Sequence, residues 1–183
     1  MDTTSMLDLR YPIGKFTFDG DATDAQRRDW LNDIARTPAA VRAAVNGLSA
    51  EQLDTPYRPG GWTVRQLVHH IPDSHLNAYV RCKLALTESE PTIKPYDEAR
   101  WAELSDSQTV PIEVSLALLD ALHQRWVALL RDVSPSDFRR AVRHPEHDRL
   151  MTLEYLLGLY AWHGRHHVAH IVGLRKREGW REL

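Results

Sequence analysis

Apolar residues recur at helical spacing in four separate stretches of this chain. The stretches cover residues 23–48, 64–86, 111–133 and the segment that follows Thr152. In each, apolar side chains fall three or four positions apart, which is the period of a helix with one buried face. No stretch alternates apolar and polar residues as a half-buried strand does. The pattern predicts an all-α fold in which the helices form an antiparallel-type four-helix bundle.

Local signals define where these helices begin and bend. Thr63 is followed three residues later by Gln66, which matches a capping box, so the second helix is predicted to start at Val64. Pro38 lies inside the first helix and Pro72 inside the second. Each proline removes a backbone donor, so we expect a bend at Pro38 and a kink near residue 70.

The segments outside the helices are predicted to be an arm and long connections. Residues 1–22 contain Pro12, Gly14 and Gly20 without a helical period, which indicates an extended N-terminal arm packed on the surface. Residues 23–183 are predicted to form a single domain. The long connection after the second helix contains a predicted short helix over residues 97–104.

Composition excludes several classes of partner. The formal net charge is −2, and acidic and basic residues are interspersed, so no basic surface for nucleic acid or for a membrane is expected. Cys82 is the single cysteine and has no partner for a disulfide, which fits a reducing compartment. No apolar stretch has the length of a signal peptide core or a membrane span. A cytoplasmic protein is predicted.

Four of the ten histidines lie within eight residues of the last helix, at positions 163, 166, 167 and 170. A helix turns by roughly 100° per residue, which places His163 and His167 on the apolar stripe and His166 and His170 at or beyond its edge. Two imidazoles one turn apart are spaced to bind one divalent cation. The alternative is that they are hydrogen-bonded core residues. Gly164 replaces the glutamate of an HExxH motif, so a zincin-type protease is not expected.

A third histidine, His70, borders the apolar face of the second helix, whereas His69 points away from it. If both helices face one core, His70, His163 and His167 supply three nitrogens and leave coordination positions open, as in a catalytic site. His123 is assigned to the core or to a supporting role behind a ligand. His144 and His147 are predicted to be solvated loop residues.

A polar row extends along the second helix from His70 through Ser74, Asn77 and Arg81. It lies beside the core-facing residues, so it either lines an internal cleft or forms a solvated face. In the first case Asn77 or Arg81 is placed to bind a substrate carboxylate. No catalytic base is identifiable, but Asp73 and His166 are near the ligands in sequence and are candidate supporting groups.

Residues 62–71 (WTVRQLVHHI) and 163–167 (HGRHH) resemble two motifs of the DinB/YfiT-like family of metal-dependent hydrolases. The family's first motif has a histidine eight residues after its tryptophan, which is His70 here. Its second motif is an HxxxH pair, which is His163 and His167 here. Residues 54–62, 124–126 and 159–163 also look like the YfiT branch, so the resemblance covers most of the chain.

The resemblance implies a DinB-like four-helix bundle with short extra helices in long connections. It implies one divalent ion per chain, zinc or alternatively nickel, held by His70, His163 and His167. It also implies a homodimer. Some members of the family transfer low-molecular-weight thiols such as bacillithiol or mycothiol onto electrophiles, and others are described as hydrolases of small molecules.

The sequence is compatible with three functions. A divalent ion held by three neutral ligands keeps its full charge, so it could activate water for hydrolysis of an ester, amide or epoxide. The same ion could stabilise a thiolate, which would make the protein a thiol S-transferase. The third possibility is a bundle that binds metal without catalysis.

Overall fold

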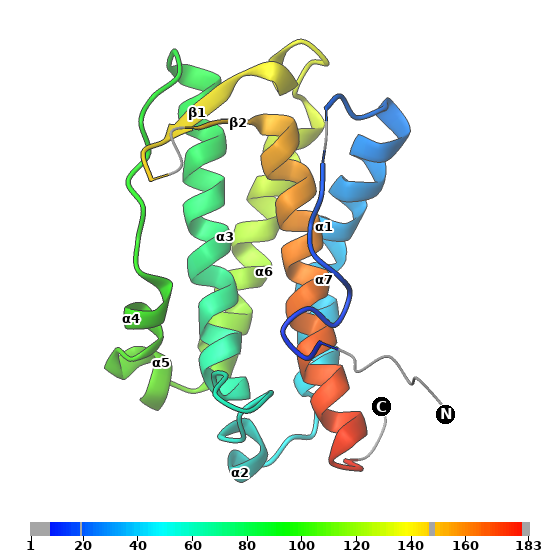
Figure 1. Ribbon diagram of the computed structural model, residues 1–183, viewed down its shortest axis with the longest axis vertical. Helices are drawn as coiled ribbons and strands as arrows, with labels where there is room; N and C mark the ends of the chain where they lie inside the picture. Colours follow the sequence, from blue (N-terminus) through cyan, green and yellow to red (C-terminus); the bar gives the residue numbers. More distant parts are fainter. Residues whose placement is uncertain (1–7, 19, 147–148, 181–183) are drawn as a thin grey trace.

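Four long helices dominate the computed structural model (Figure 1). They are α1 (Asp24–Val45), α3 (Val64–Thr87), α6 (Ile112–Arg131) and α7 (Leu153–Arg177). The structure describes residues 8–18, 20–146 and 149–180. Within this part of the chain the predicted four-helix bundle is confirmed, and none of its helices is long and apolar enough to cross a membrane.

The order of the helices around the bundle is α1, α7, α3 and α6, with α6 closing against α1. The predicted antiparallel arrangement is only partly correct. Residues 88–111 carry the chain back along the bundle, so α6 starts at the same end as α3 and runs parallel to it (Figure 1). This connection contains the short helices α4 (Glu98–Ala102) and α5 (Ser105–Thr109), whereas α2 (Ala50–Leu53) precedes α3. The sequence prediction included only one helix here.

A small two-stranded hairpin, which no pattern in the sequence indicated, joins α6 to α7 in this helical fold. After a 3-10 turn at Asp137–Arg139, β1 (Ala141–His144) pairs antiparallel with β2 (Arg149–Thr152). Val142 pairs with Met151 in this register, and both side chains are buried on the upper part of the core. Strands of four residues are too short to show an alternating pattern in the sequence.

Side-chain caps fix the helix starts that the sequence indicated. The Thr63 hydroxyl accepts from the Gln66 backbone N–H at 3.1 Å, and the Gln66 side chain accepts from the Thr63 N–H at 3.0 Å. The predicted capping box is therefore confirmed. Thr152 caps α7 by accepting from the Tyr155 N–H at 3.1 Å.

The buried apolar residues form two clusters along the bundle. One surrounds Trp126 and Leu156, and the other surrounds Leu67 and Ile171. Along α3 the first cluster holds residues 78–85 and the second holds 64–71, while on α7 they hold 153–161 and 171–174. Between the clusters lie His75 on α3 and the four histidines at positions 163, 166, 167 and 170 on α7. The four-helix bundle therefore has a polar layer across its middle.

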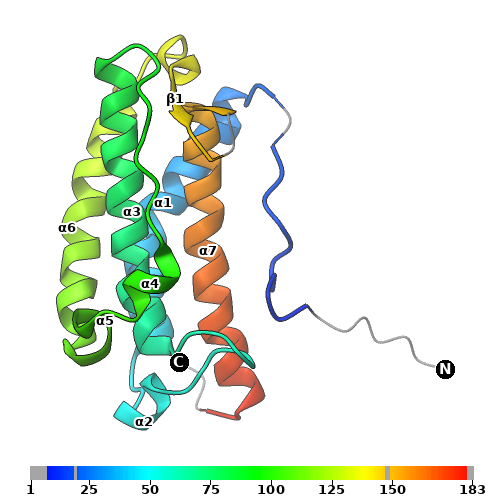
Figure 2. The ribbon, with the colours of Figure 1, turned by 60° about the vertical axis from the view of Figure 1, so that its left-hand side comes forward.

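The N-terminal arm runs along α7 (Figure 2). Trp162 Nε1 donates to the Gly14 carbonyl at 3.1 Å, and the Phe16 ring meets Tyr155 at 5.5 Å between centroids. Phe18 meets Trp30 of α1 at 5.4 Å. These contacts agree with an arm packed on the surface, although residues 1–7 lie outside the described part.

Gly164 sets the distance between α1 and α7 at the level of the histidine layer. A Cβ added there would lie 2.5 Å from Thr37 Oγ1 and 2.8 Å from Thr37 Cγ2. Both residues are buried, so the side chain of Thr37 has no open space to move into. The close approach of these helices depends on the missing side chain.

We expect Gly164→Ala to lower the free energy of unfolding by about 1–3 kcal/mol, because it overpacks this contact. Thr37→Ala removes both clashing atoms, so the double variant should recover much of the loss in urea unfolding. Gly173→Ala on the same helix is the matched control. Its Cβ would meet only the flexible tip of Arg177 at 3.3 Å, so it should gain roughly 0.5–1 kcal/mol of helix propensity. Similar effects of the two alanines would contradict this account.

Candidate metal centre

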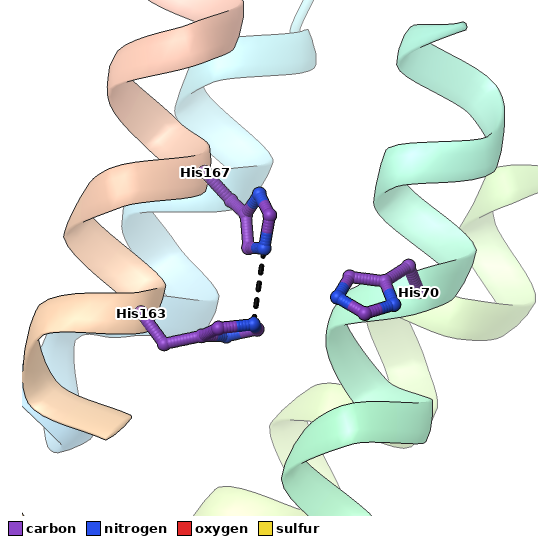
Figure 3. Close-up of side chains that lie close together, drawn as sticks. All are labelled: His70, His163 and His167. Atoms are coloured by element: carbon purple, nitrogen blue, oxygen red, sulfur yellow. Dashed lines mark hydrogen bonds between the residues drawn. The ribbon is translucent and has the colours of Figure 1, made fainter. Parts of the chain in front are cut away.

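Three imidazoles from two helices meet in the histidine layer. His70 comes from α3, and His163 and His167 come from α7 one turn apart, with their rings extending toward His70 (Figure 3). One ring nitrogen of each residue lies within 4.8 Å of the other two, and the two Nε2 atoms on α7 are 3.0 Å apart. A divalent ion binds imidazole nitrogens at about 2.0–2.1 Å, so small side-chain movements would bring all three to one ion.

Burial keeps these three rings uncharged. It lowers the pKa of His70 to about 4. Burial also lowers the pKa values of His163 and His167 well below the ordinary value, and the neighbouring histidines lower them further. At neutral pH each ring therefore has a lone pair available, which is the form that binds a metal. The donor set fits a divalent ion of the zinc type.

A line of hydrogen bonds extends from His163 into the core. His163 Nδ1 lies 3.0 Å from His75 Nε2, His75 Nδ1 lies 2.8 Å from His123 Nε2, and His123 Nδ1 lies 2.7 Å from the carbonyl oxygen of Ile34. His75 and His123 are almost fully buried, with exposures of 0% and 2%. We call His163, His75 and His123 the histidine line. The prediction that His123 has a core or supporting role agrees with its place here.

The end of this line fixes the tautomer of every ring in it. The Ile34 oxygen can only accept, so His123 donates from Nδ1 and, being neutral, accepts at Nε2. His75 then donates from Nδ1 and accepts at Nε2, so His163 must donate from Nδ1. The lone pair of His163 is consequently left on Nε2, the atom that faces His167.

Pro38 explains why the Ile34 oxygen is available. In a helix the carbonyl of residue 34 normally accepts from the N–H of residue 38, but proline has none. Pro38 lies inside α1 and is buried. The unpaired acceptor is satisfied from another helix, by His123 of α6.

His75 was missed in the sequence analysis. With His70 taken as the origin, the helical repeat places His75 near ~140°, beside Ile71 at ~100° and Ala78 at ~80°. It therefore lies on the apolar stripe, and a search for every histidine on that stripe would have found it. The polar row singled out from the sequence lies nearer to the direction of His70 itself, between roughly −20° and 40°.

A second group of histidines lies further along α7. His166, His167 and His170 also have ring nitrogens within 4.8 Å of one another, and Nε2 of His166 is 3.0 Å from Nε2 of His170. All three come from one helix. Burial and the nearby His166 lower the pKa of His170 to about 3, and the positive charges of Arg58 and Arg177 contribute. Those cations make this group the less favourable place for a divalent ion.

His70, His163 and His167, which we call the triad, line a cavity of about 780 Å³. Ser74 and Arg81 line it as the sequence predicted for an internal cleft, and His166 lines it as well. His144 was predicted to be a solvated loop residue, and this was wrong. It belongs to β1, is buried, and lines the same cavity. His147 lies outside the described residues.

Asn77, a candidate for binding substrate, and Asp73, a candidate supporting group, are not among the residues that line the cavity. The Asn77 side chain donates to the Asp73 backbone carbonyl at 2.9 Å. Burial raises the pKa of Asp73 to about 6, and the charge of Asp106 on α5 adds to the effect. His69, which was predicted to point away from the apolar face, is buried, and its Nδ1 lies 2.7 Å from Ser115 Oγ of α6.

Comparison with known proteins defines the class of protein to which this fold and site belong. The sequence profile of the DinB superfamily matches residues 24–171, so the chain belongs to that superfamily. A relative from Oceanobacillus iheyensis, named "Putative metal-dependent hydrolase", is 54% identical over 174 residues, which is 95% of this chain and 100% of the relative. A relative of the same name from Bacillus mycoides is 54% identical over 175 residues, which is 96% of this chain and 100% of the relative.

The solved structure of YfiT from Bacillus subtilis resembles the whole bundle. The TM-score is 0.93 at 50% identity, with 94% of this chain and 99% of YfiT covered. YfiT is described as a probable metal-dependent hydrolase with an unusual four-helix bundle topology. The predicted membership and fold are confirmed. The names of these relatives and the histidine groups together point to a divalent metal.

Stability of the metal-free protein should fall as the pH drops from about 6.5 to about 4. The pKa values of His70 and His123 are both lowered to about 4 by burial. The unfolded chain takes up these protons first, so acid favours unfolding. Between pH 7 and pH 5 each residue should contribute a loss of about 2 kcal/mol in urea unfolding. In His123→Phe the total loss should be smaller by about that amount, and an unchanged pH dependence would reject the neutral, buried state of His123.

Zinc affinity should depend on the histidine line. His75→Phe removes the acceptor for His163 Nδ1, and loss of such a supporting hydrogen bond weakens metal binding roughly 10–100-fold. Competition with a chromophoric chelator measures the change. His69→Phe is the matched control, because His69 is a buried, hydrogen-bonded histidine of the same helix that faces Ser115. Equal zinc affinities in the two variants would contradict a role for the line.

Proposed function

We propose that this protein is a metal-dependent hydrolase of small molecules and that His70, His163 and His167 hold one divalent ion, zinc in the first instance. The observation that carries the proposal is the meeting of three neutral ring nitrogens, within 4.8 Å of one another, at the wall of a 780 Å³ cavity. When bound, the ion would supply a Lewis acid that activates water at neutral pH.

The triad is preferred over the second histidine group for two reasons. It draws ligands from α3 and α7, so ion binding would link two helices. In addition, the histidine line fixes His163 with its lone pair on Nε2. His170 lies instead beside Arg58 and Arg177, whose charges repel a cation.

The chain's own residues support the chemistry in distinct ways. The histidine line holds the proton of His163 on Nδ1 and so prevents the ring from turning its N–H toward the cavity. Trp62 packs against His70 at 4.7 Å between ring centroids, and Trp162 stacks on His166 at 4.3 Å. Of the two candidate supporting groups named from the sequence, His166 lines the cavity, so it is the better placed to accept a proton from water. Asp73 is not part of that wall.

A thiol S-transferase is the competing function, because an ion with three neutral ligands also stabilises a thiolate. A low-molecular-weight thiol and a homodimer both stay predictions. Thiol dependence of the reaction distinguishes the two functions.

The zinc-loaded protein is expected to hydrolyse small aryl esters without added thiol. His163→Ala should lose most bound zinc and reduce ester turnover at least about a hundredfold, because the ion supplies the main catalytic charge. His170→Ala is the control and should retain one equivalent of zinc. Metal content is measured by mass spectrometry and turnover by absorbance. Product that forms only with thiol would reject the hydrolase, and stoichiometric zinc in His163→Ala would reject the ligands.

A further inference from the structure

Arg81 is a buried cation in the wall of the cavity. Its side chain lies on α3, is only 9% exposed, and lines the same cavity as the triad. No carboxylate of a described residue forms an ion pair with it. By contrast, Arg27 pairs with Glu154, and Arg65 pairs with Asp54 at 2.7 Å. Burying an unpaired guanidinium is costly, so its retention in the cavity wall requires a reason.

The groups around Arg81 are neutral. Arg81 and Ser74 both oppose the rise that burial causes in the pKa of Tyr160, and Ser74 does the same for the pKa of Tyr96, so these groups are neighbours. These hydroxyl groups can orient the guanidinium, but they carry no charge to balance it. The carboxylates among the cavity-lining residues are Glu98 and Glu146, and both are exposed. The positive charge of Arg81 is therefore left for a molecule in the cavity.

Besides the exposed Glu98 and Glu146, two further arginines line the cavity. Arg10 lines the rim and is paired with Asp8 at 3.0 Å, while Arg58 lies over the Tyr57 ring at 5.4 Å. The triad contributes no negative charge, because its three ligands are neutral imidazoles. With a divalent ion present, the inner cavity would hold two sources of positive charge and no compensating carboxylate.

Tyr160 connects Arg81 to the triad in space. Its ring lies 5.5 Å from that of His163, and the nearby charge of Arg81 lowers the pKa of its hydroxyl against the effect of burial. His70 and Arg81 are eleven residues apart on α3, about 16 Å along the helix axis. Because arginine side chains on a helix lean toward its N-terminus, the guanidinium lies on the order of 10 Å from the triad. A small molecule can span that distance.

We propose that the substrate carries a carboxylate that binds Arg81 while its reacting group lies at the histidine triad. This inference rests on the proposed metal site and names the substrate class of that site. A guanidinium binds a carboxylate through two parallel hydrogen bonds. One planar guanidinium supported by neutral hydroxyls matches the single charge and the two oxygens of a carboxylate.

Matched hydroxamates test the proposal by binding alone. Monohydroxamates of the dicarboxylic acids from succinic to suberic have a metal-binding head and a carboxylate tail, and n-alkyl hydroxamates of equal length lack the tail. In calorimetric titrations of the zinc-loaded protein, one carboxylate probe should bind about tenfold more tightly than its alkyl partner. Arg81→Met should abolish that difference while leaving the alkyl affinity unchanged, and Arg81→Lys should retain part of it.

The unchanged alkyl affinity in Arg81→Met verifies that the variant is folded and loaded with zinc. Equal binding of the paired probes by the unaltered protein, whether tight or undetectable, overturns the proposed anion site. An undiminished preference of Arg81→Met for the carboxylate probe also overturns it. The proposed hydrolase is tested separately by ester turnover. A protein that prefers the carboxylate probes but hydrolyses no ester has the anion site without the hydrolase activity.

Discussion

The hydrogen bond from His123 to the carbonyl oxygen of Ile34 is the constraint on which the candidate site depends. That oxygen is free because Pro38 cannot donate to it. A carbonyl has no proton to give, so it imposes one direction on every hydrogen bond from His123 through His75 to His163. Without such an end point a row of neutral imidazoles could reverse all its donors at once, and Nε2 of His163 would then carry a hydrogen instead of a lone pair.

The rest of the bundle keeps this line in place. The line crosses from α1 through α6 and α3 to α7, so it is sensitive to the position of every long helix. Apolar clusters on either side of the histidine layer fix the spacing, and the contact of Gly164 with Thr37 holds α7 against α1. Parallel packing of α3 on α6 brings His75 level with His123. The long return connection, which an antiparallel bundle would not need, therefore serves the site.

Sequence reasoning predicted the parts of the site that follow from helical periodicity alone. His163 and His167 share a stripe because they are four residues apart, and the capping box at Thr63 fixes the phase of α3 and hence the direction of His70. What it did not predict depends on contacts between helices. The partner of the Ile34 oxygen and the parallel course of α6 are set by packing, which no local pattern encodes. Burial of His144 follows from a hairpin too short to be recognised.

Under the proposed function, the charge of the site rather than its ligands would distinguish one substrate from another. Three neutral imidazoles can hold an ion, and burial lowers the pKa of His70 to about 4, so the ligands add no negative charge at neutral pH. An enzyme that used carboxylate ligands would compensate part of the ion's charge itself. With the proposed ion bound at these three histidines, the compensation would be left to the molecule in the cavity, and Arg81 would increase the demand. A neutral molecule would leave both the ion and Arg81 without an anionic partner in a site that is partly shielded from water. The charge of a small molecule would therefore decide its binding before its shape does.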